Sequence, residues 1–488
     1  MYPDLSTFLE ISKTARMVPL SEEFDMDTQT PIGIFMRFAR MENSFLLESV
    51  EGGERWARYS HIGRRPFLIF KSSGENMTVI ENGRRESKKG DPFEELKRLR
   101  SEYKGVRFKG APRFCGGAVG YIGYDMARRI ENLPGAPRDD IGLPECYLGF
   151  YDEIITYDHL KQRVIITVNA KTHGEGDARD SYRRAEERIE NTRQEIMSAF
   201  VPPAAEAAPR AAGMELESTF TREEFLAAVK RAKEYIVDGD IFQVQLSRRL
   251  SVKTDADPFG VYRALRTLNP SPYLYYLKFE DTVIVGSSPE LMVRVEDGTV
   301  ETCPIAGTCR RGADEAEDEE LAKRLLADEK ERAEHTMLID LGRNDIGKVS
   351  EFGSVKVINP MHIEKYSHVM HLVTNVAGKM KEGLDCIDAL RAVLPAGTLT
   401  GAPKVRAMQI IDELEPVKRG CYGGCVGYMG FDGNLDTCIT IRTVIFHKGR
   451  AYIQAAAGIV ADSVPEKEFE ETLNKGQALF LAIEKAGR

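Results

Sequence analysis

The 488-residue chain lacks the features that mark membrane, secreted and nucleic-acid-binding proteins. No apolar run comes near the roughly 20 residues that a membrane-spanning helix needs. The N-terminus carries acidic residues early and has no apolar core, so it does not read as a secretory signal. The net charge of -9 argues against a general nucleic-acid binder. We therefore expect a soluble, cytoplasmic protein with neither a membrane nor a nucleic acid as partner.

Paired cysteines are also missing. The sequence has eight cysteines but no C-x-x-C spacing, and Cys421 and Cys425 stand four residues apart. That spacing is a poor signature for a metal site or a redox pair. Small, buried and reduced side chains in a cytosolic protein are the favoured interpretation.

A regular alternation of strands and helices is absent as well. Hairpin-like pairs of short strands with occasional helices favour an antiparallel sheet over βαβ units. We expect strands at 45–50 and 55–61 around a Gly52-Gly53 turn, and at 154–157, 164–168, 242–250, 274–279, 283–286, 291–295 and 452–459. A helix is expected at 4–16, ended by Val18-Pro19. Further helices are expected at 31–40, 91–103, 177–200, 221–239, around 318–341 and at 465–486, with a capping box at Thr221 and Glu224.

The segment 201–213 is rich in alanine and proline and has no hydrophobic period, which predicts a linker. We expect an N-terminal region at 1–205 and a second domain at 214–488. Two glycine-spaced segments, GGAVGYIGYD at 116–125 and GGCVGYMGFD at 423–432, are alike. One short match of this kind is suggestive of an internal duplication.

The densest pattern lies between residues 394 and 443. A turn at 395–398 and a second glycine, Gly401, lead into an amphipathic helix with Pro403 at its first position. A glycine-rich loop that enters a helix N-terminus leaves backbone N–H groups free to hold an anion. A plain helix between two tight turns would explain any one feature. It does not explain their density beside the basic residues Lys404 and Arg442.

Two pairs of acidic residues are candidate metal ligands. Glu331 and Glu334 stand three apart in one expected helix, and Glu468 and Glu471 stand three apart in another. Residues three apart share a helix face, and Mg²⁺ prefers oxygen ligands of this kind. The chain has 76 acidic residues, however, so pairs on solvated helix faces also arise by chance.

Several long blocks resemble the chorismate-utilising enzymes, and among them the anthranilate synthases. They read GTLTGAPKVRAMQIID, YGGCVGYMG, DTCITIRT and SHVMHLVTNVAG, and the resemblance runs from about Phe45 to the C-terminus. It implies an α+β fold in which antiparallel β-sheets pack face to face with helices outside. The active site would lie between the sheets, in the second half of the chain.

The resemblance also implies a reaction, in which chorismate and ammonia give anthranilate and pyruvate. Glu290, otherwise a turn carboxylate, takes the place of the general acid for the departing hydroxyl, and His371, otherwise an ordinary structural histidine, could assist proton removal. The two acidic pairs match the family's Mg²⁺ cluster. The expected substrate-binding residues are Gly307, Thr308, Thr398, Lys404, Tyr422, Arg442, Ala456, Ala457 and Gly458, with Ala456 replacing the usual glycine.

Two positions discriminate among relatives. Family members that add water to chorismate carry a lysine base where this chain has Gln243. Aminodeoxychorismate synthases usually carry a nucleophilic lysine where this chain has Ala306. Both residues favour anthranilate synthesis. Aminodeoxychorismate or salicylate synthesis is the alternative reaction, and a catalytically silent tryptophan-binding subunit is the alternative of another class.

The resemblance finally implies a partner and a regulator. A separate glutamine amidotransferase subunit is the expected ammonia source, in a hetero-oligomer such as a heterotetramer. L-tryptophan is the expected inhibitor. Taken alone, the residues around 48 suggest an amphipathic strand edge and those around 270 a rigid proline turn. By resemblance they are two walls of the tryptophan site, formed by Glu48, Ser49, Asn269, Pro270, Pro272, Tyr273 and Leu274.

Overall fold

The computed structural model describes residues 1–49, 58–172, 177–200, 215–365 and 369–486. The expected turn at Gly52-Gly53 and the expected linker at 201–213 lie outside these residues. None of the helices within the described ranges is long and apolar enough to cross a membrane.

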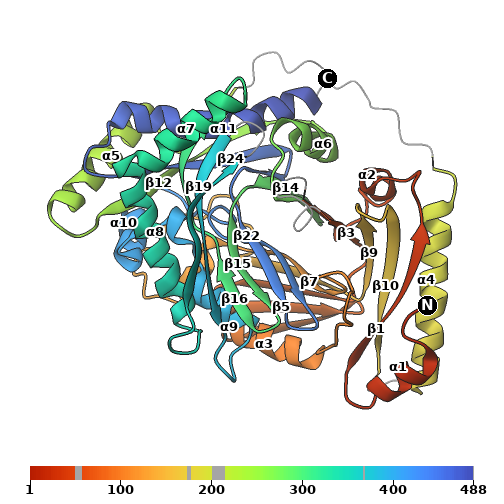
Figure 1. Cartoon of the computed structure of the whole chain (residues 1–488). Coiled ribbons are helices and arrows are strands. Elements are labelled where there is room, and N and C mark those ends of the chain that lie inside the picture. Colours follow the sequence, from red (N-terminus) through yellow and green to blue (C-terminus); the bar gives the residue numbers. More distant parts are fainter. Residues whose placement is uncertain (50–57, 173–176, 201–214, 366–368, 487–488) are drawn as a thin grey trace.

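Two antiparallel sheets, each with twelve described strands, form the body of the protein (Figure 1). The first runs in the order β1 (Met17–Asp25), β10 (Arg163–Lys171), β9 (Glu153–Asp158), β3 (Tyr59–Gly63), β2 (Ser44–Glu48), β13 (Tyr273–Phe279), β14 (Thr282–Ser288), β23 (Thr443–His447), β24 (Arg450–Ile459), β12 (Gln243–Lys253) and β11 (Glu217–Ser218), with β20 (Gly401–Ala402) beside β12. The second runs in the order β17 (Ile305–Arg310), β19 (Val369–Lys379), β16 (Thr299–Thr302), β15 (Leu291–Glu296), β22 (Leu435–Ile439), β21 (Cys425–Gly430), β7 (Gly117–Ile122), β8 (Cys146–Tyr151), β4 (Leu68–Ser73), β5 (Asn76–Glu81) and β6 (Arg84–Lys89), with β18 (Lys356–Lys365) beside β19.

The two sheets pack face to face through an aromatic core. Phe45 and Tyr275 of the first sheet are buried in one cluster with Tyr121, Tyr151 and Val426 of the second. This arrangement confirms the predicted α+β sandwich. Each sheet takes strands from both sides of the expected linker, so the two regions share their sheets. The domain boundary itself stays a prediction.

Helices cover the outer faces. In the first sheet α4 packs on β1 and β10, and α6 and α11 pack against β14 and β24 (Figure 1). The helices are α1 (Leu5–Ile11), α2 (Pro31–Phe35), α3 (Pro92–Glu102), α4 (Ala178–Met197), α5 (Arg222–Val237), α6 (Pro258–Leu268), α7 (Glu315–Ala327), α8 (Glu329–Gly347), α9 (Cys386–Val393), α10 (Lys404–Leu414) and α11 (Pro465–Ala486). Two short 3-10 helices, η1 (Tyr124–Arg129) and η2 (Gly397–Leu399), complete the set. The expected C-terminal helix and the capping box at Thr221 and Glu224 are confirmed.

The two look-alike glycine segments form neighbouring strands, β7 and β21, in which Gly120 lies opposite Gly427. A side chain at Gly120 would collide with the carbonyl oxygen of Tyr147, and one at Gly427 with that of Asp436. Glycine is therefore required at both places by close backbone approach.

Three expected helices differ from the observed ones. The first ends at Ile11, and Pro19, expected to end it, lies within β1. β1 is at the edge of its sheet, where a residue without an N–H is tolerated. The helix expected at 31–40 ends at Phe35. The helix expected around 318–341 is two helices, because the side chain of Asp328 accepts hydrogen bonds from Lys330 and Glu331 N–H and so starts α8 anew.

Candidate active site

Glu290 lies between β14 and β15 with only 8% of its surface exposed. The hydroxyl of Thr398, in η2, donates a hydrogen bond of 2.7 Å to its Oε1. Burial raises the pKa of Glu290 to about 7, although Thr398 and the positive charges of Arg442 and Lys475 oppose the rise. This carboxyl can therefore carry a proton near neutral pH, as a general acid must.

Arg442 precedes β23 with a left-handed φ of +50°. It interacts electrostatically with Glu290, Tyr422 and Glu471, and burial lowers the pKa of its guanidinium. Tyr422 is buried in the segment before β21, and burial raises the pKa of its phenol. A guanidinium and a neutral phenol next to an acid form a site that suits a carboxylate.

Gln243 begins β12, and its Nε2 donates a 3.1 Å hydrogen bond to Oε1 of Glu334 on α8. The opposite strand brings Gly458 close: a side chain there would come within 3.0 Å of the same Nε2. The structure thus brings together Gln243, where relatives that add water carry a lysine base, an expected metal ligand and one expected substrate-binding residue.

His371 lies on β19 and contacts β17. Its Nδ1 is 3.0 Å from Oγ1 of Thr308 and 3.2 Å from the carbonyl oxygen of Gly307. Burial lowers the pKa of its imidazole. Gly307 has a φ of +61° at an irregularity of the strand, and a side chain there would come within 3.1 Å of Oε2 of Glu331. The backbone at Gly307, which carries no side chain, therefore lies next to both His371 and Glu331.

The four acidic residues stand as two separate pairs, one in the first turns of α8 and one in those of α11. In the ranges that the structure describes, no three His, Cys, Asp or Glu side chains are grouped closely enough to hold a metal ion. Burial and then the charge of Glu334 raise the pKa of Glu331, and burial and the charge of Glu471 raise that of Glu468. Oxygen donors that repel one another in this way fit a hard dication, which would relieve the repulsion.

The residues expected on β24 have two orientations. Ala457 is buried in the cluster of α5 and α10, whereas Ala456 belongs to the other large core together with Tyr422. The alternation of a strand explains this difference. The carbonyl of Ala456 accepts a 2.8 Å hydrogen bond from Lys475, which also pairs with Glu471 at 2.5 Å. The sequence prediction missed Lys475, whose one signal is its place one turn after Glu471.

Lys404 has two partners within the protein. We expected it to bind substrate, but its Nζ lies 2.5 Å from Oδ2 of Asp345 and donates to the carbonyl of Val393 at 3.1 Å. Asp345 is in the last turns of α8, so this buried pair anchors that helix to the start of α10. The substrate-binding role of Lys404 stays a prediction. The anion seat at the N-terminus of α10 stays a prediction.

A separate cavity of about 300 Å³ lies between β2, β13, β15, β21 and β22. Its lining includes Ser49, Pro272, Tyr273 and Leu274, which the sequence placed in the tryptophan site. Its far wall holds Arg294, whose Nε donates to Asp436 at 3.0 Å and whose Nη2 donates to the hydroxyl of Tyr273 at 2.9 Å. A cavity lined by aromatic side chains together with polar groups is typical of a small-molecule site.

Glu48 has partners on β3 and α6. It borders this cavity, but its carboxylate accepts hydrogen bonds from Tyr262 and Ser60 and lies 3.3 Å from Nε of Arg266. Because side chains alternate along β2, this carboxylate faces α6 and is already satisfied there. Asn269 and Pro270 are not among the lining residues: Asn269 ends α6 and accepts a hydrogen bond from Ser287.

Comparisons with known proteins agree on one family. A family model described as chorismate binding enzyme matches residues 43–480. Anthranilate synthase component 1 of Acetivibrio thermocellus is 55% identical, covering 100% of this chain and 99% of that protein. The Pseudomonas putida component 1 is 46% identical, covering 96% of this chain and 95% of that protein.

Solved structures show the same architecture. Anthranilate synthase component I from Streptococcus pneumoniae has a TM-score of 0.78 at 38% identity, covering 87% of this chain and 92% of that one. A menaquinone-specific isochorismate synthase from Escherichia coli, at 18% identity and a TM-score of 0.71 over 98% and 99% of the two chains, shares the fold. The chain therefore belongs to the chorismate binding enzyme family.

Proposed function

We propose that this protein converts chorismate and ammonia into anthranilate and pyruvate in tryptophan biosynthesis. The supporting observation is the buried Glu290, whose pKa is raised to about 7 beside Arg442. That carboxyl can protonate the departing hydroxyl as ammonia attacks the ring. The high identity to proteins named anthranilate synthase component 1 supports the same reaction.

The surrounding residues have matching roles. Arg442 and Tyr422, with the backbone at Gly307 and Gly458, would hold the substrate carboxylates. The lowered pKa of His371 keeps its imidazole neutral at pH 7, so it can accept the proton that is lost as the ring becomes aromatic.

Glu331, Glu334, Glu468 and Glu471 would hold Mg²⁺. When bound, the ion would supply positive charge to the ring carboxylate. The open coordination positions that Mg²⁺ keeps for water are suited to such a ligand.

Gln243 and Ala306 favour this reaction over its two relatives. Gln243 already donates to Glu334, and an amide cannot act as the base that water addition needs. Ala306 has no amine with which to form a covalent adduct, as aminodeoxychorismate synthesis requires in this family. A silent regulatory subunit would have no need of a protonated acid at position 290.

Ammonium and glutamine separate these functions. The purified chain with chorismate, Mg²⁺ and ammonium is expected to produce anthranilate fluorescence, because ammonia is a competent nucleophile without activation. Glutamine is expected to act as the nitrogen source only after a glutaminase subunit is added. Aminodeoxychorismate as product would show that Ala306 was misread, and glutamine hydrolysis by the chain alone would contradict a separate ammonia source.

We also propose that the 300 Å³ cavity binds L-tryptophan and inhibits the enzyme. The cavity and the acid share a strand: Arg294 in its wall is on β15, which begins directly after Glu290. The next strand, β22, contributes Asp436 to the cavity, and Ile439 N–H donates to the carbonyl of Glu290 at 3.0 Å. A ligand that shifts these strands would therefore bias the position of the acid.

Ser49→Phe is expected to abolish inhibition by tryptophan while ammonium-dependent turnover stays nearly unchanged. Ser49 lines the cavity, so a phenyl ring there would occupy the space of the indole or its head group. Calorimetry should show that the variant no longer binds tryptophan. In the wild type, chorismate and tryptophan should each weaken the binding of the other by the same factor. Ser87→Phe, on exposed β6, is the control. Tight binding to Ser49→Phe would exclude this site.

A further inference from the structure

Two buried charged side chains, Glu415 and Arg419, lie beside η2 and β12. Arg419 is 3% exposed and Glu415 is 4% exposed. They form a bidentate pair, in which Nε of Arg419 donates to Oε2 of Glu415 at 2.9 Å and Nη2 donates to Oε1 at 2.6 Å. Removing two charges from water is costly, so a buried pair is in itself weak evidence for stability. The contacts of the pair with the backbone explain its place.

The pair completes the hydrogen bonding of β12. On one side of this strand, β20 pairs with the first two residues only, and β11 pairs near the other end. Between them, the carbonyl of Gln245 accepts a 2.7 Å hydrogen bond from Nη2 of Arg419, and Ser247 N–H donates to Oε1 of Glu415 at 2.7 Å. Buried backbone groups without partners are costly. The two side chains therefore take the place of a strand along this stretch.

Arg419 also reaches η2, the element that holds the candidate acid. Its Nη1 donates to the carbonyl of Leu399 at 2.6 Å. Carbonyls at the end of a helical turn have no partner within that turn, so they need one from outside. Leu399 directly follows Thr398, whose hydroxyl donates the 2.7 Å hydrogen bond to Glu290. One guanidinium thus joins β12 to the turn that carries Thr398.

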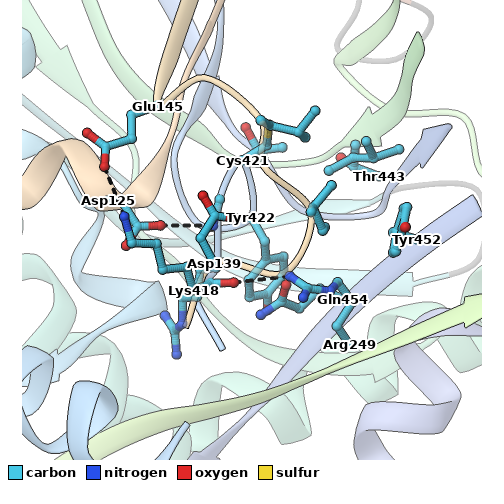
Figure 2. A pocket seen from close by; sticks show the side chains of 16 residues that line it. Asp125, Asp139, Glu145, Arg249, Lys418, Cys421, Tyr422, Thr443, Tyr452 and Gln454 are labelled. Carbon is cyan, nitrogen blue, oxygen red and sulfur yellow. Dashed lines mark hydrogen bonds and ion pairs between the residues drawn. The ribbon is translucent and has the colours of Figure 1, made fainter. Parts of the chain in front are cut away.

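The segment that carries Arg419 is anchored on both sides. Asp125, in η1, accepts a 3.0 Å hydrogen bond from Gly420 N–H (Figure 2). The carbonyl of Arg419 accepts a 3.2 Å hydrogen bond from Tyr422 N–H. The guanidinium lies over the ring of Tyr124, 4.6 Å from its centroid. The backbone and the head group of Arg419 are therefore both fixed.

We propose that Arg419 is a positioning residue for the candidate acid: it fixes η2 against β12 and so keeps the hydroxyl of Thr398 on the carboxyl of Glu290. The inference rests on the proposed role of Glu290 as general acid. Arg419 exchanges no proton, since a guanidinium stays charged in proteins. A purely structural pair would need only the contacts with β12. The hydrogen bond to Leu399 is the contact that gives Arg419 its second role.

Arg419→Lys tests this role. Lysine keeps the charge, but its single nitrogen cannot reproduce the fork that reaches Glu415, Gln245 and Leu399 together. The kcat of ammonium-dependent anthranilate formation is expected to fall about tenfold or more, the factor that one hydrogen bond from a charged donor supports. A loss of rate alone would also follow from a damaged fold, so a second readout is needed.

The pH profile provides that readout. Burial raises the pKa of Glu290, and the hydrogen bond from Thr398 lowers it. Loss of this hydrogen bond raises the pKa further, so the fall of kcat/KM with rising pH should move to higher pH in Arg419→Lys. Thr398→Val removes the donor directly and should give the same shift. Because both changes act on one hydrogen bond, the double variant should shift no further.

Arg64→Lys is the matched control. Arg64 is 4% exposed and pairs with Glu153 and Glu195, but it lies beside α4 in the distant part of the first sheet. This variant should keep the pH profile of the wild type. If Arg419→Lys does not fold, Glu415→Asp decides the matter, because it draws the guanidinium back by one methylene and should shift the profile in the same direction.

An unchanged pH profile in folded Arg419→Lys would overturn the proposal and leave the pair a structural role only. A crystal structure of this variant tests the positioning without turnover: Thr398 Oγ1 should no longer lie within hydrogen-bond distance of Glu290, and an intact bond would also overturn the proposal. Wild-type protein that makes no anthranilate from ammonium would instead contradict the proposed function.

Discussion

Replacing Glu290 with glutamine is expected to lower ammonium-dependent anthranilate formation by about a thousandfold, within the range that general acid catalysis supplies. Glutamine keeps the size of the side chain and can still accept the hydrogen bond from Thr398, which is 2.7 Å long in the native protein. It has no acidic proton to give to the departing hydroxyl. Steady-state fluorescence with saturating chorismate measures the loss.

The same residue sets the expected pH dependence. The acid must be protonated, and the pKa of Glu290 is raised from 4.5 to about 7 by burial. The rate of anthranilate formation should therefore fall as the pH rises through about 7, because Glu290 of the free enzyme loses its proton there. The residual activity of Glu290→Gln should not show this fall. A thousandfold loss with an unchanged pH profile would assign the proton to another group.

Burial of this acid also has a cost in stability. The folded protein binds the proton more tightly than the unfolded chain, so stability is fully present below pH 4.5 and is lost as pH rises towards 7. The loss is on the order of 3 kcal/mol. Glu290→Gln should accordingly melt higher than the wild type at pH 8, and the exposed Glu86→Gln on β6 should not.

The sequence predicted those parts of the fold that depend on local pattern. The amphipathic period of α11 and the reciprocal cap of Thr221 and Glu224 act within one helix, and both are confirmed. The antiparallel architecture followed from hairpins whose strands are close in sequence. Pro19 misled the prediction, since proline is permitted in β1 only because that strand lies at a sheet edge, which is a property of the whole sheet.

Two contacts of the site residues were missed for the same reason. Lys404 was assigned to the substrate because it follows a glycine-rich turn, but its partner Asp345 lies 59 residues earlier, on another helix. Glu48 was assigned to tryptophan, but α6 supplies Tyr262 and Arg266 on the other face of the strand. Both side chains are ionisable and buried, so each is held by its nearest opposite charge or donor. Sequence spacing does not give that partner.

Replacing one glutamate of either acidic pair, on α8 or on α11, is expected to cause a second large loss of turnover. Glu334→Gln and Glu471→Gln should each lower turnover by at least about a hundredfold, since a metal ion contributes several kcal/mol to charge stabilisation. The two residues lie on different helices, α8 and α11, and one metal ion held between the helices would account for an equal effect of both variants. Excess chelator should inactivate the wild type to a similar extent.

Stability gives a readout that does not depend on activity. Without a bound cation, the charge of Glu334 contributes to the raised pKa of Glu331, so the two carboxylates repel each other. Glu334→Gln removes that repulsion, so in chelator the variant should melt at a higher temperature than the wild type. Added Mg²⁺ should raise the melting temperature of the wild type and should raise that of the variant much less. Glu470→Gln, exposed on the same helix as Glu471, is the control and should retain both turnover and the response to Mg²⁺. Full activity of the wild type in excess chelator would show that the four carboxylates serve another purpose.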